Sequence, residues 1–273
     1  MSTPVAVQPL PRGRIGRAVG KRLRDWVPAA AVLVGALVVW EKAIEVFDVQ
    51  NFLLPKPTTI VSTFWDNRGE LLRAGWFTFQ EALGGFALGR GAAILLAIVL
   101  ARWRGLGRAL MPYAVAANAI PIVAFAPITN AWFSPLTQTS KIVIAAVLCF
   151  FPVLVNTLRG LTSVHPSSIE LMRSYAAGDF SIFLRVRLPT ALPFIFTALK
   201  VASVLAMIGA VVGEYFGGSF EALGVLIQSR AQIFAFEEAW AGILVAALFG
   251  MAFYVSIALV ERVTLRWMPS TVE

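Results

Sequence analysis

The chain has 273 residues, of which 58% are hydrophobic and 14% are charged, and its mean hydropathy is +0.77. Soluble domains carry about 25% charged residues, so this composition excludes an ordinary soluble protein and indicates an integral membrane protein. The apolar stretches are far longer than the roughly ten alternating residues of a barrel strand. We therefore expect an all-α polytopic membrane helix bundle surrounded by membrane lipid.

The formal net charge of +8 does not indicate nucleic-acid binding, because most basic residues flank apolar segments instead of forming one basic surface. The single cysteine, Cys149, cannot form an internal disulfide, and with the single histidine, His165, it makes no metal site. We expect no metal, no cofactor and no catalytic residues.

Six apolar segments are long enough, at about 20 residues, to cross a bilayer. They cover approximately residues 27–47, 77–101, 110–133, 142–161, 191–212 and 239–260. Glu41, Lys42 and Glu45 interrupt the end of the first segment. A signal peptide also has a basic region before a short apolar core, but no small-residue cleavage site follows here, so we expect a retained helix.

The basic residues predict the orientation of these spans. With the amino terminus inside, the cytoplasmic segments hold fifteen basic residues and the outer segments hold five. Cytoplasmic segments of membrane proteins are enriched in Lys and Arg, so we expect both termini in the cytoplasm. The chain then divides into a basic cytoplasmic segment (1–26), a transmembrane domain (27–262) and a cytoplasmic tail (263–273).

A few polar residues inside the spans are candidates for a translocation path, because an ionisable group within a membrane is costly and often functional. They are Arg90, Asn118, Lys200 and Glu214. Lys200 and Glu214 are fourteen residues apart, so they share a helix face about 21 Å apart and do not pair directly. Structural pairing with other helices is the alternative. Two Gly-x-x-x-Gly patterns, at Gly85 and Gly209, predict close helix packing.

The stretch 167–193 is a polar interruption between two long apolar segments. Ser167 and Glu170 predict a capping box that starts one short helix, and Gly178 is expected to end it in left-handed geometry. Asp179 can cap a second helix, which should end near Leu188 because Pro189 disfavours helical geometry before it. The two short helices predict either a docking segment or an ordinary cytoplasmic loop.

This stretch resembles the cytoplasmic signature loop of permeases from binding-protein-dependent ABC importers. Gly178 matches the glycine of that loop, and Leu188-Pro189 matches its closing Leu-Pro, one residue nearer than in the general pattern. Where the family often has Glu-Ala-Ala, this chain has 172–174 as Met-Arg-Ser, and the nearest acid is Glu170.

The resemblance extends over roughly residues 50 to 262. The segments FLLPKPTTI (52–60), AIPIVAFAPI (119–128), SKIVIAAVLCFFPVLVNTLRGL (140–161) and VVGEYFGG (211–218) are similar to the nitrate/sulfonate/taurine branch. That branch includes close relatives for thiamine-pyrimidine precursors and riboflavin. The resemblance therefore implies as substrate either a small vitamin or vitamin precursor or a nitrate-, sulfonate- or taurine-like anion.

The family's properties are expectations for this chain. They are the type I ABC importer permease fold, a location in the bacterial inner membrane, pairing with a second permease copy, ATP-binding cassette ATPase subunits and an extracytoplasmic substrate-binding protein. The resemblance implies a coupling loop over 162–190. Its expected coupling residues are Glu170, Arg173, Ala177, Gly178, Asp179, Leu188 and Pro189.

The residues also bear on competing functions. The nearest approach to a P-loop, Gly16 to Lys21, has the wrong spacing and is followed by Arg22 instead of Ser or Thr. We therefore expect ATP hydrolysis on a separate chain. An ATP-independent secondary transporter or channel is the main alternative, but we find no internal repeat of the kind such transporters carry. A membrane enzyme would need a cluster of acids or histidines within the spans.

Overall fold

The computed structural model describes residues 14–50, 54–117, 119 and 121–267, and the regular secondary structure in these ranges is helical. The expectation of an all-α membrane bundle is confirmed. The elements are α1 (Arg14–Val46), α2 (Pro57–Asp66), α3 (Arg68–Arg102), α4 (Arg104–Ala117), α5 (Ile122–Phe133), α6 (Gln138–Thr162), α7 (Pro166–Ser174), α8 (Asp179–Ile182), the π-helical turn η1 (Phe183–Arg187), α9 (Leu188–Tyr215), α10 (Leu223–Gln232) and α11 (Phe236–Thr264).

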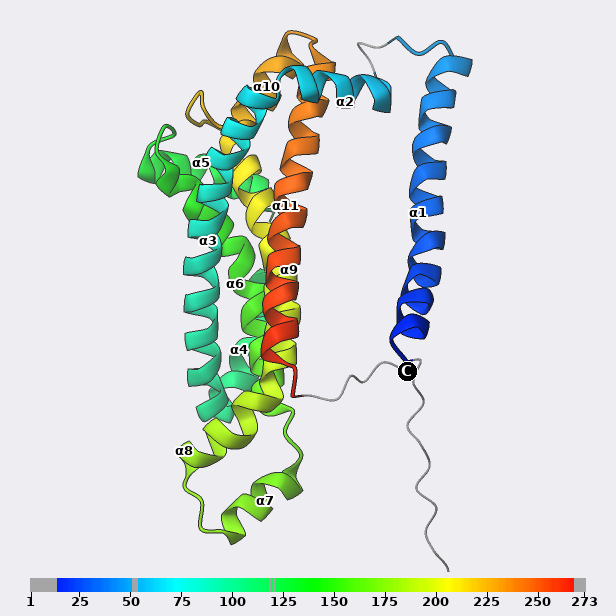
Figure 1. Ribbon diagram of the computed structural model, residues 1–273. Coiled ribbons are helices and arrows are strands. Elements are labelled where there is room, and N and C mark those ends of the chain that lie inside the picture. Colours follow the sequence, from blue (N-terminus) through cyan, green and yellow to red (C-terminus); the bar gives the residue numbers. More distant parts are fainter. Residues whose placement is uncertain (1–13, 51–53, 118, 120, 268–273) are drawn as a thin grey trace, which may run out of the picture.

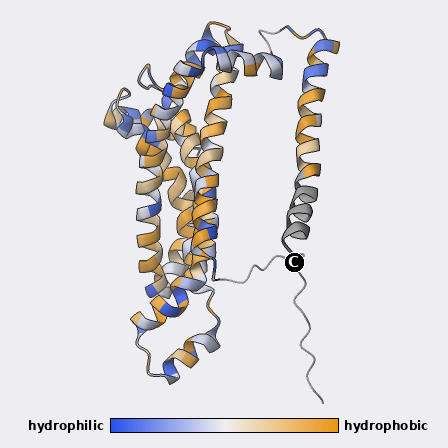
Figure 2. Cartoon of the chain, in the orientation of Figure 1, coloured by the Kyte–Doolittle hydropathy of each residue, from blue (hydrophilic) through white to orange (hydrophobic). Residues whose placement is uncertain are grey.

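The helices α3, α6, α9 and α11 form the body of the molecule, with α2 and α10 across one end and α7 and α8 beyond the other (Figure 1). Colouring by hydropathy shows apolar residues along the length of the bundle and polar residues gathered towards its two ends (Figure 2). This distribution fits a bundle whose middle lies in lipid and whose ends meet water.

Glycines bring the central helices into close contact. A Cβ on Gly85 of α3 would lie 2.4 Å from the Cβ of Ala145 on α6, and one on Gly209 of α9 would lie 2.8 Å from the Cα of Ala145. Both distances are shorter than an ordinary carbon contact. The prediction that these glycines permit close helix packing is confirmed.

The third predicted span differs from expectation. Among the described residues, five helices are long and apolar enough to cross a membrane, and α4 with α5 makes a sixth span only if the pair, bent by 92°, is counted as one. The predicted span over 110–133 is therefore broken into two helices, α4 and α5. Pro121 immediately precedes α5, and a proline both lacks an N–H donor and disfavours helical geometry in the residue before it.

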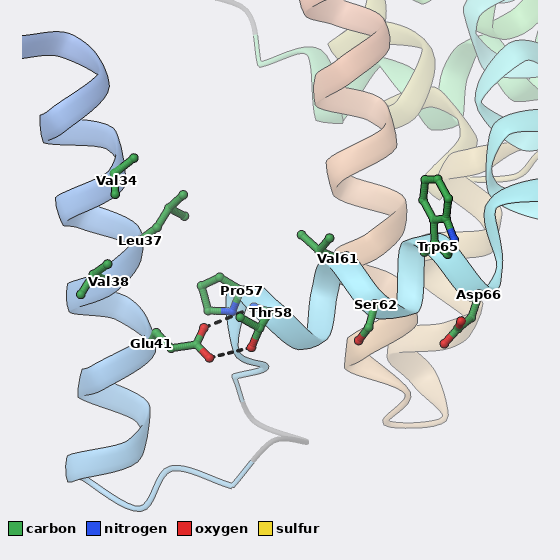
Figure 3. Close-up of a pocket in the computed structure, with 10 residues that line it drawn as sticks. All are labelled: Val34, Leu37, Val38, Glu41, Pro57, Thr58, Val61, Ser62, Trp65 and Asp66. Carbon is green, nitrogen blue, oxygen red and sulfur yellow. Dashed lines mark hydrogen bonds between the residues drawn. The ribbon is translucent and has the colours of Figure 1, made fainter. Parts of the chain in front are cut away.

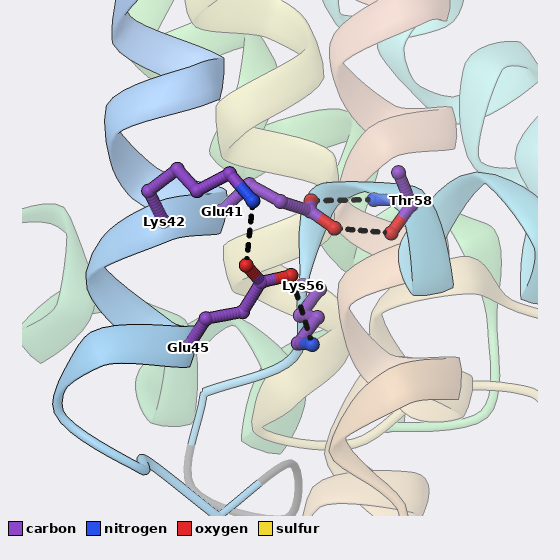
Figure 4. A network of polar contacts seen from close by, with 5 residues as sticks. All are labelled: Glu41, Lys42, Glu45, Lys56 and Thr58. Atoms are coloured by element: carbon purple, nitrogen blue, oxygen red, sulfur yellow. Dashed lines mark hydrogen bonds and ion pairs between the residues drawn. The ribbon is translucent and has the colours of Figure 1, made fainter.

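Helix α1 lies beside the bundle, and near its carboxyl end it is hydrogen-bonded to α2. The carboxylate of Glu41 accepts hydrogen bonds from the backbone N–H and the hydroxyl of Thr58, at 3.2 Å and 2.6 Å, at the start of α2. Glu45 pairs with Lys42 and Lys56 (Figure 4). The charges that interrupt the first apolar segment therefore join α1 to α2.

An open, mainly apolar groove of about 710 Å³ lies between these two helices (Figure 3).

Candidate functional site

The predicted docking segment, residues 162–190, forms a helix pair that projects beyond the end of the bundle (Figure 1). Helix α7 begins at Pro166, and its N-cap is His165, whose Nδ1 accepts from the backbone N–H of Ser167 at 3.4 Å. The predicted capping box from Ser167 to Glu170 was wrong. Proline is favoured at the first helical position because it has no N–H to satisfy and its φ is already helical, so the cap falls at His165, two residues before Ser167.

The turn after α7 uses an alanine where a glycine was expected. Ala176 has φ +56°, and its N–H donates to the carbonyl of Arg173 at 2.9 Å, while the N–H of Ala177 donates to that of Met172 at 3.0 Å. These two bonds form a Schellman motif. Gly178 has φ −72° and ψ 164°, so the prediction that it adopts left-handed geometry was wrong. It instead precedes α8 in extended backbone.

The tip of this segment is open. A Cβ on Gly178 would meet nothing within 4 Å, and Tyr175 and Phe180 are 76% and 75% exposed. Glu170, Arg173 and Asp179 are also exposed, and Ala177 is half-buried. Asp179 lies 3.9 Å from Arg102, but both side chains are about 70% exposed, so this pair holds the segment weakly. Aromatic and arginine side chains are enriched in protein–protein interfaces.

The second half of the segment does not end where expected. Helix α8 continues through η1 into α9, and together they form one span over Asp179–Tyr215. The N–H of Leu188 donates to the carbonyl of Phe183, five residues back. In a regular helix Pro189 would clash with the carbonyl four residues before it, and the wider π-turn relieves this clash. Leu188 and Pro189 thus lie half-buried in the first turn of a long helix.

The path candidates lie in different surroundings. Arg90 on α3 is exposed, with its guanidinium 5.1 Å from the ring centre of Phe86. Lys200 on α9 makes a 2.7 Å ion pair with Glu261 on α11, and both side chains are 21% exposed. Glu214 is fully buried near the end of α9. Asn118 lies outside the described residues. Lys200 and Glu214 have separate partners and do not pair with each other, as their spacing predicted.

Glu214 belongs to a buried polar cluster that sequence reasoning largely missed. Its carboxylate accepts from the hydroxyl of Thr78 on α3 at 2.7 Å and from the N–H of Gly224 on α10 at 2.6 Å. Glu81 on α3 and Lys141 on α6 are buried beside it. Glu81 could have been found by the criterion that selected Arg90, because it also interrupts the second apolar segment.

The sequence of residues 92–268 matches the family described as the binding-protein-dependent transport system inner membrane component. The chain belongs to this family. It is 34% identical over 268 residues to the riboflavin transport system permease protein RibX of Chloroflexus aurantiacus. This alignment covers 96% of this chain and 99% of that protein. The formylaminopyrimidine transport permease protein ThiX of Halalkalibacterium halodurans is 34% identical, covering 85% and 92%. The nitrate import permease protein NrtB of Leptolyngbya laminosa is 26% identical, covering 80% of each.

These similarities show that the chain is a permease subunit of an ABC importer, a transport protein that crosses the inner membrane several times. The matched region of the permease begins within α3 and includes α4 to α11, and so it contains the docking segment. The matched region starts after Glu81 and Arg90 in the sequence, and it does not include the polar contacts between α1 and α2. The predicted family and the predicted permease function are therefore confirmed.

Proposed function

We propose that this permease imports its substrate with two ATP-binding cassette ATPase subunits, and that the docking segment over 162–190 is their contact. The single observation that carries this proposal is the open tip of the segment. Gly178 leaves space for a close approach, and the exposed rings of Tyr175 and Phe180 lie on either side of it. Glu170 and Arg173 supply exposed charges where the family often has Glu-Ala-Ala.

The end of the molecule that carries the docking segment is proposed to be cytoplasmic. The start of α1, the end of α3 and the end of α11 lie at this same end (Figure 1). These are the segments that carry most of the basic residues, and basic residues concentrate on the cytoplasmic side. The opposite end, with α2 and α10, would then receive substrate from an extracytoplasmic binding protein.

A second copy of the permease is proposed to complete the translocation path. Arg90 is exposed near the middle of the long helix α3, and an arginine facing lipid at that depth would be strongly unfavourable. A water-filled path formed with the partner copy removes this penalty. Lys200 is the second path candidate, whereas Glu214 would meet a path only in a conformation that separates α10 from α9. A cysteine at Arg90 should therefore react with a water-soluble thiol reagent.

The substrate proposed for this permease is a small vitamin or vitamin precursor. Support comes from the 34% identity to both RibX and ThiX, against 26% to NrtB. A nitrate-, sulfonate- or taurine-like anion is the alternative, and binding measurements on the partner binding protein would separate the two.

The coupling proposal is tested by Gly178→Asp, with Gly69→Asp as its matched control. Neither position has an atom within 4 Å of an added Cβ, so both variants should fold and insert normally. A docked glycine tolerates no side chain, and a charge buried in a cleft without a partner is strongly unfavourable. Co-purification with the ATPase in mild detergent should fall at least tenfold for Gly178→Asp and stay normal for Gly69→Asp. Equal recovery of ATPase by both variants would refute the proposal.

A further inference from the structure

The polar cluster at the junction of α3, α6, α9 and α10 is not explained by substrate transport or ATPase docking. Thr78, Glu81, Lys141 and Glu214 are each at most 2% exposed. A buried charge without compensation is strongly unfavourable. The protonation state of this cluster is therefore constrained by its own hydrogen bonds and its own charge balance.

Glu214 has the contacts of an ionised carboxylate. One oxygen accepts from the hydroxyl of Thr78 at 2.7 Å, and the other accepts from the backbone N–H of Gly224 at 2.6 Å. The Thr78 oxygen in turn accepts from the backbone N–H of Leu223 at 2.9 Å. Short bonds from donors to both oxygens stabilise the charged form. Through these bonds Glu214 and Thr78 hold the first turn of α10.

Glu81 has the opposite surroundings. Glu81 lies one helical turn after Thr78 on α3, in the same buried cluster as Glu214, and its Oε2 is buried without a hydrogen-bond partner. Two ionised carboxylates cannot hydrogen-bond to each other, because neither has a donor. A proton on Glu81 supplies the missing donor.

The charge balance requires the same proton. The ammonium group of Lys141 donates to the backbone carbonyls of Pro135 and Thr137 and contributes one positive charge. The charged groups that face Glu81 are Glu214 from α9 and Lys141 from α6, while α10 presents the backbone N–H groups of Leu223 and Gly224 to the cluster. With one proton the cluster is neutral, and without it the cluster holds an excess negative charge.

We infer that Glu81, Glu214 and Lys141 form a one-proton binding site, in which Glu81 holds the proton and donates it to the Glu214 carboxylate. The shared proton ties α3 to α9 at the end of the bundle opposite the docking segment. Removal of the proton leaves two like charges in contact and weakens the attachment of α10. The site therefore makes the attachment of α10 to α3 and α9 dependent on protonation.

Infrared spectroscopy of the purified permease at pH 7 tests the inference directly. A protonated carboxyl group has a carbonyl stretch that an ionised carboxylate lacks. Glu81→Gln keeps an N–H donor towards Glu214 but removes the carboxyl group, so this band should lose the intensity of one group. Glu221→Gln, at an exposed position of the neighbouring loop, should leave the band unchanged. An identical band in the wild type and in Glu81→Gln would overturn the inference.

The pH dependence of unfolding provides a second test. A folded state that holds a proton which the unfolded chain releases loses stability as pH rises, by tenfold in the unfolding equilibrium constant per pH unit. This loss applies above the range in which an unfolded glutamate titrates, until Glu81 itself releases its proton. Wild-type permease in detergent should therefore unfold more easily at pH 8 than at pH 6, and Glu81→Gln should show a flatter profile. Parallel profiles would contradict the inference. Neither measurement involves the ATPase, so a failure here leaves the docking proposal standing.

Discussion

Substitution of Gly85 by alanine should weaken the contact between α3 and α6 by an amount that the structure defines. The added Cβ would lie 2.4 Å from the Cβ of Ala145 and 2.8 Å from the carbonyl oxygen of Ile142. One of these neighbours is backbone and the other is the first side-chain atom, so neither can rotate away. Carbon atoms pack at about 3.5 Å or more, so the two helices must separate locally by roughly 1 Å.

A gap of this size removes about a quarter to a half of the dispersion energy of each contact, which is itself about 0.1–0.2 kcal/mol. Over some tens of atom pairs the loss is on the order of 1–3 kcal/mol, which agrees with typical values for overpacked cores. Gly91 on the same helix has nothing within 4 Å of an added Cβ. Gly91→Ala should therefore be neutral or gain up to about 1 kcal/mol from helix propensity.

Unfolding of the two variants in mixed micelles, with an increasing fraction of a denaturing detergent and circular dichroism as the signal, measures this difference. Gly85→Ala should unfold at a lower fraction of denaturing detergent than wild type, and Gly91→Ala at the same or a higher fraction. If the two variants unfold together, the close approach of α3 and α6 does not limit stability and the reasoning fails.

Three further predictions concern other parts of the chain. Lys200→Met should destabilise the protein by about 2 kcal/mol because it leaves Glu261 without its partner in a half-buried site, and adding Glu261→Leu should recover most of the loss; additive effects in detergent unfolding would argue against the ion pair. Ala176→Val should speed proteolysis of the docking segment, because a β-branched side chain is strained at positive φ; an unchanged cleavage rate would count against that geometry. Reporters fused at Glu273 and inserted near Gly69 should report opposite sides of the membrane, and a common side would refute the proposed orientation.

The long apolar helices and the protein family could be predicted from the sequence because they depend on composition and on residue order. A run of about 20 apolar residues must satisfy its backbone hydrogen bonds internally, so it forms a helix in almost any tertiary context. The glycine patterns at Gly85 and Gly209 likewise indicated close packing, because no larger residue would leave that space.

The local details depended on competition between neighbouring residues, and here the sequence was less informative. Pro166 displaced the helix start that Ser167 predicted, and Ala176 took the left-handed position expected for Gly178. Pro189 did not end a helix because a π-turn accommodates it. The partner of Glu214 could not be predicted, since Thr78 is 136 residues away in the chain and only the packing of α3 against α9 brings them together.

The unbroken helix from Asp179 to Tyr215 acts mechanically as a single rod. Its 37 residues measure about 55 Å at 1.5 Å per residue, so it reaches from the tip beside Gly178 to the buried carboxylate of Glu214. A displacement of the end near Gly178 would rotate the helix about its packing contacts and so move the end near Glu214. Helices bend most readily at π-bulges and prolines, so the stiffness of the turn before Pro189 would determine how much of a displacement at one membrane surface reaches the other.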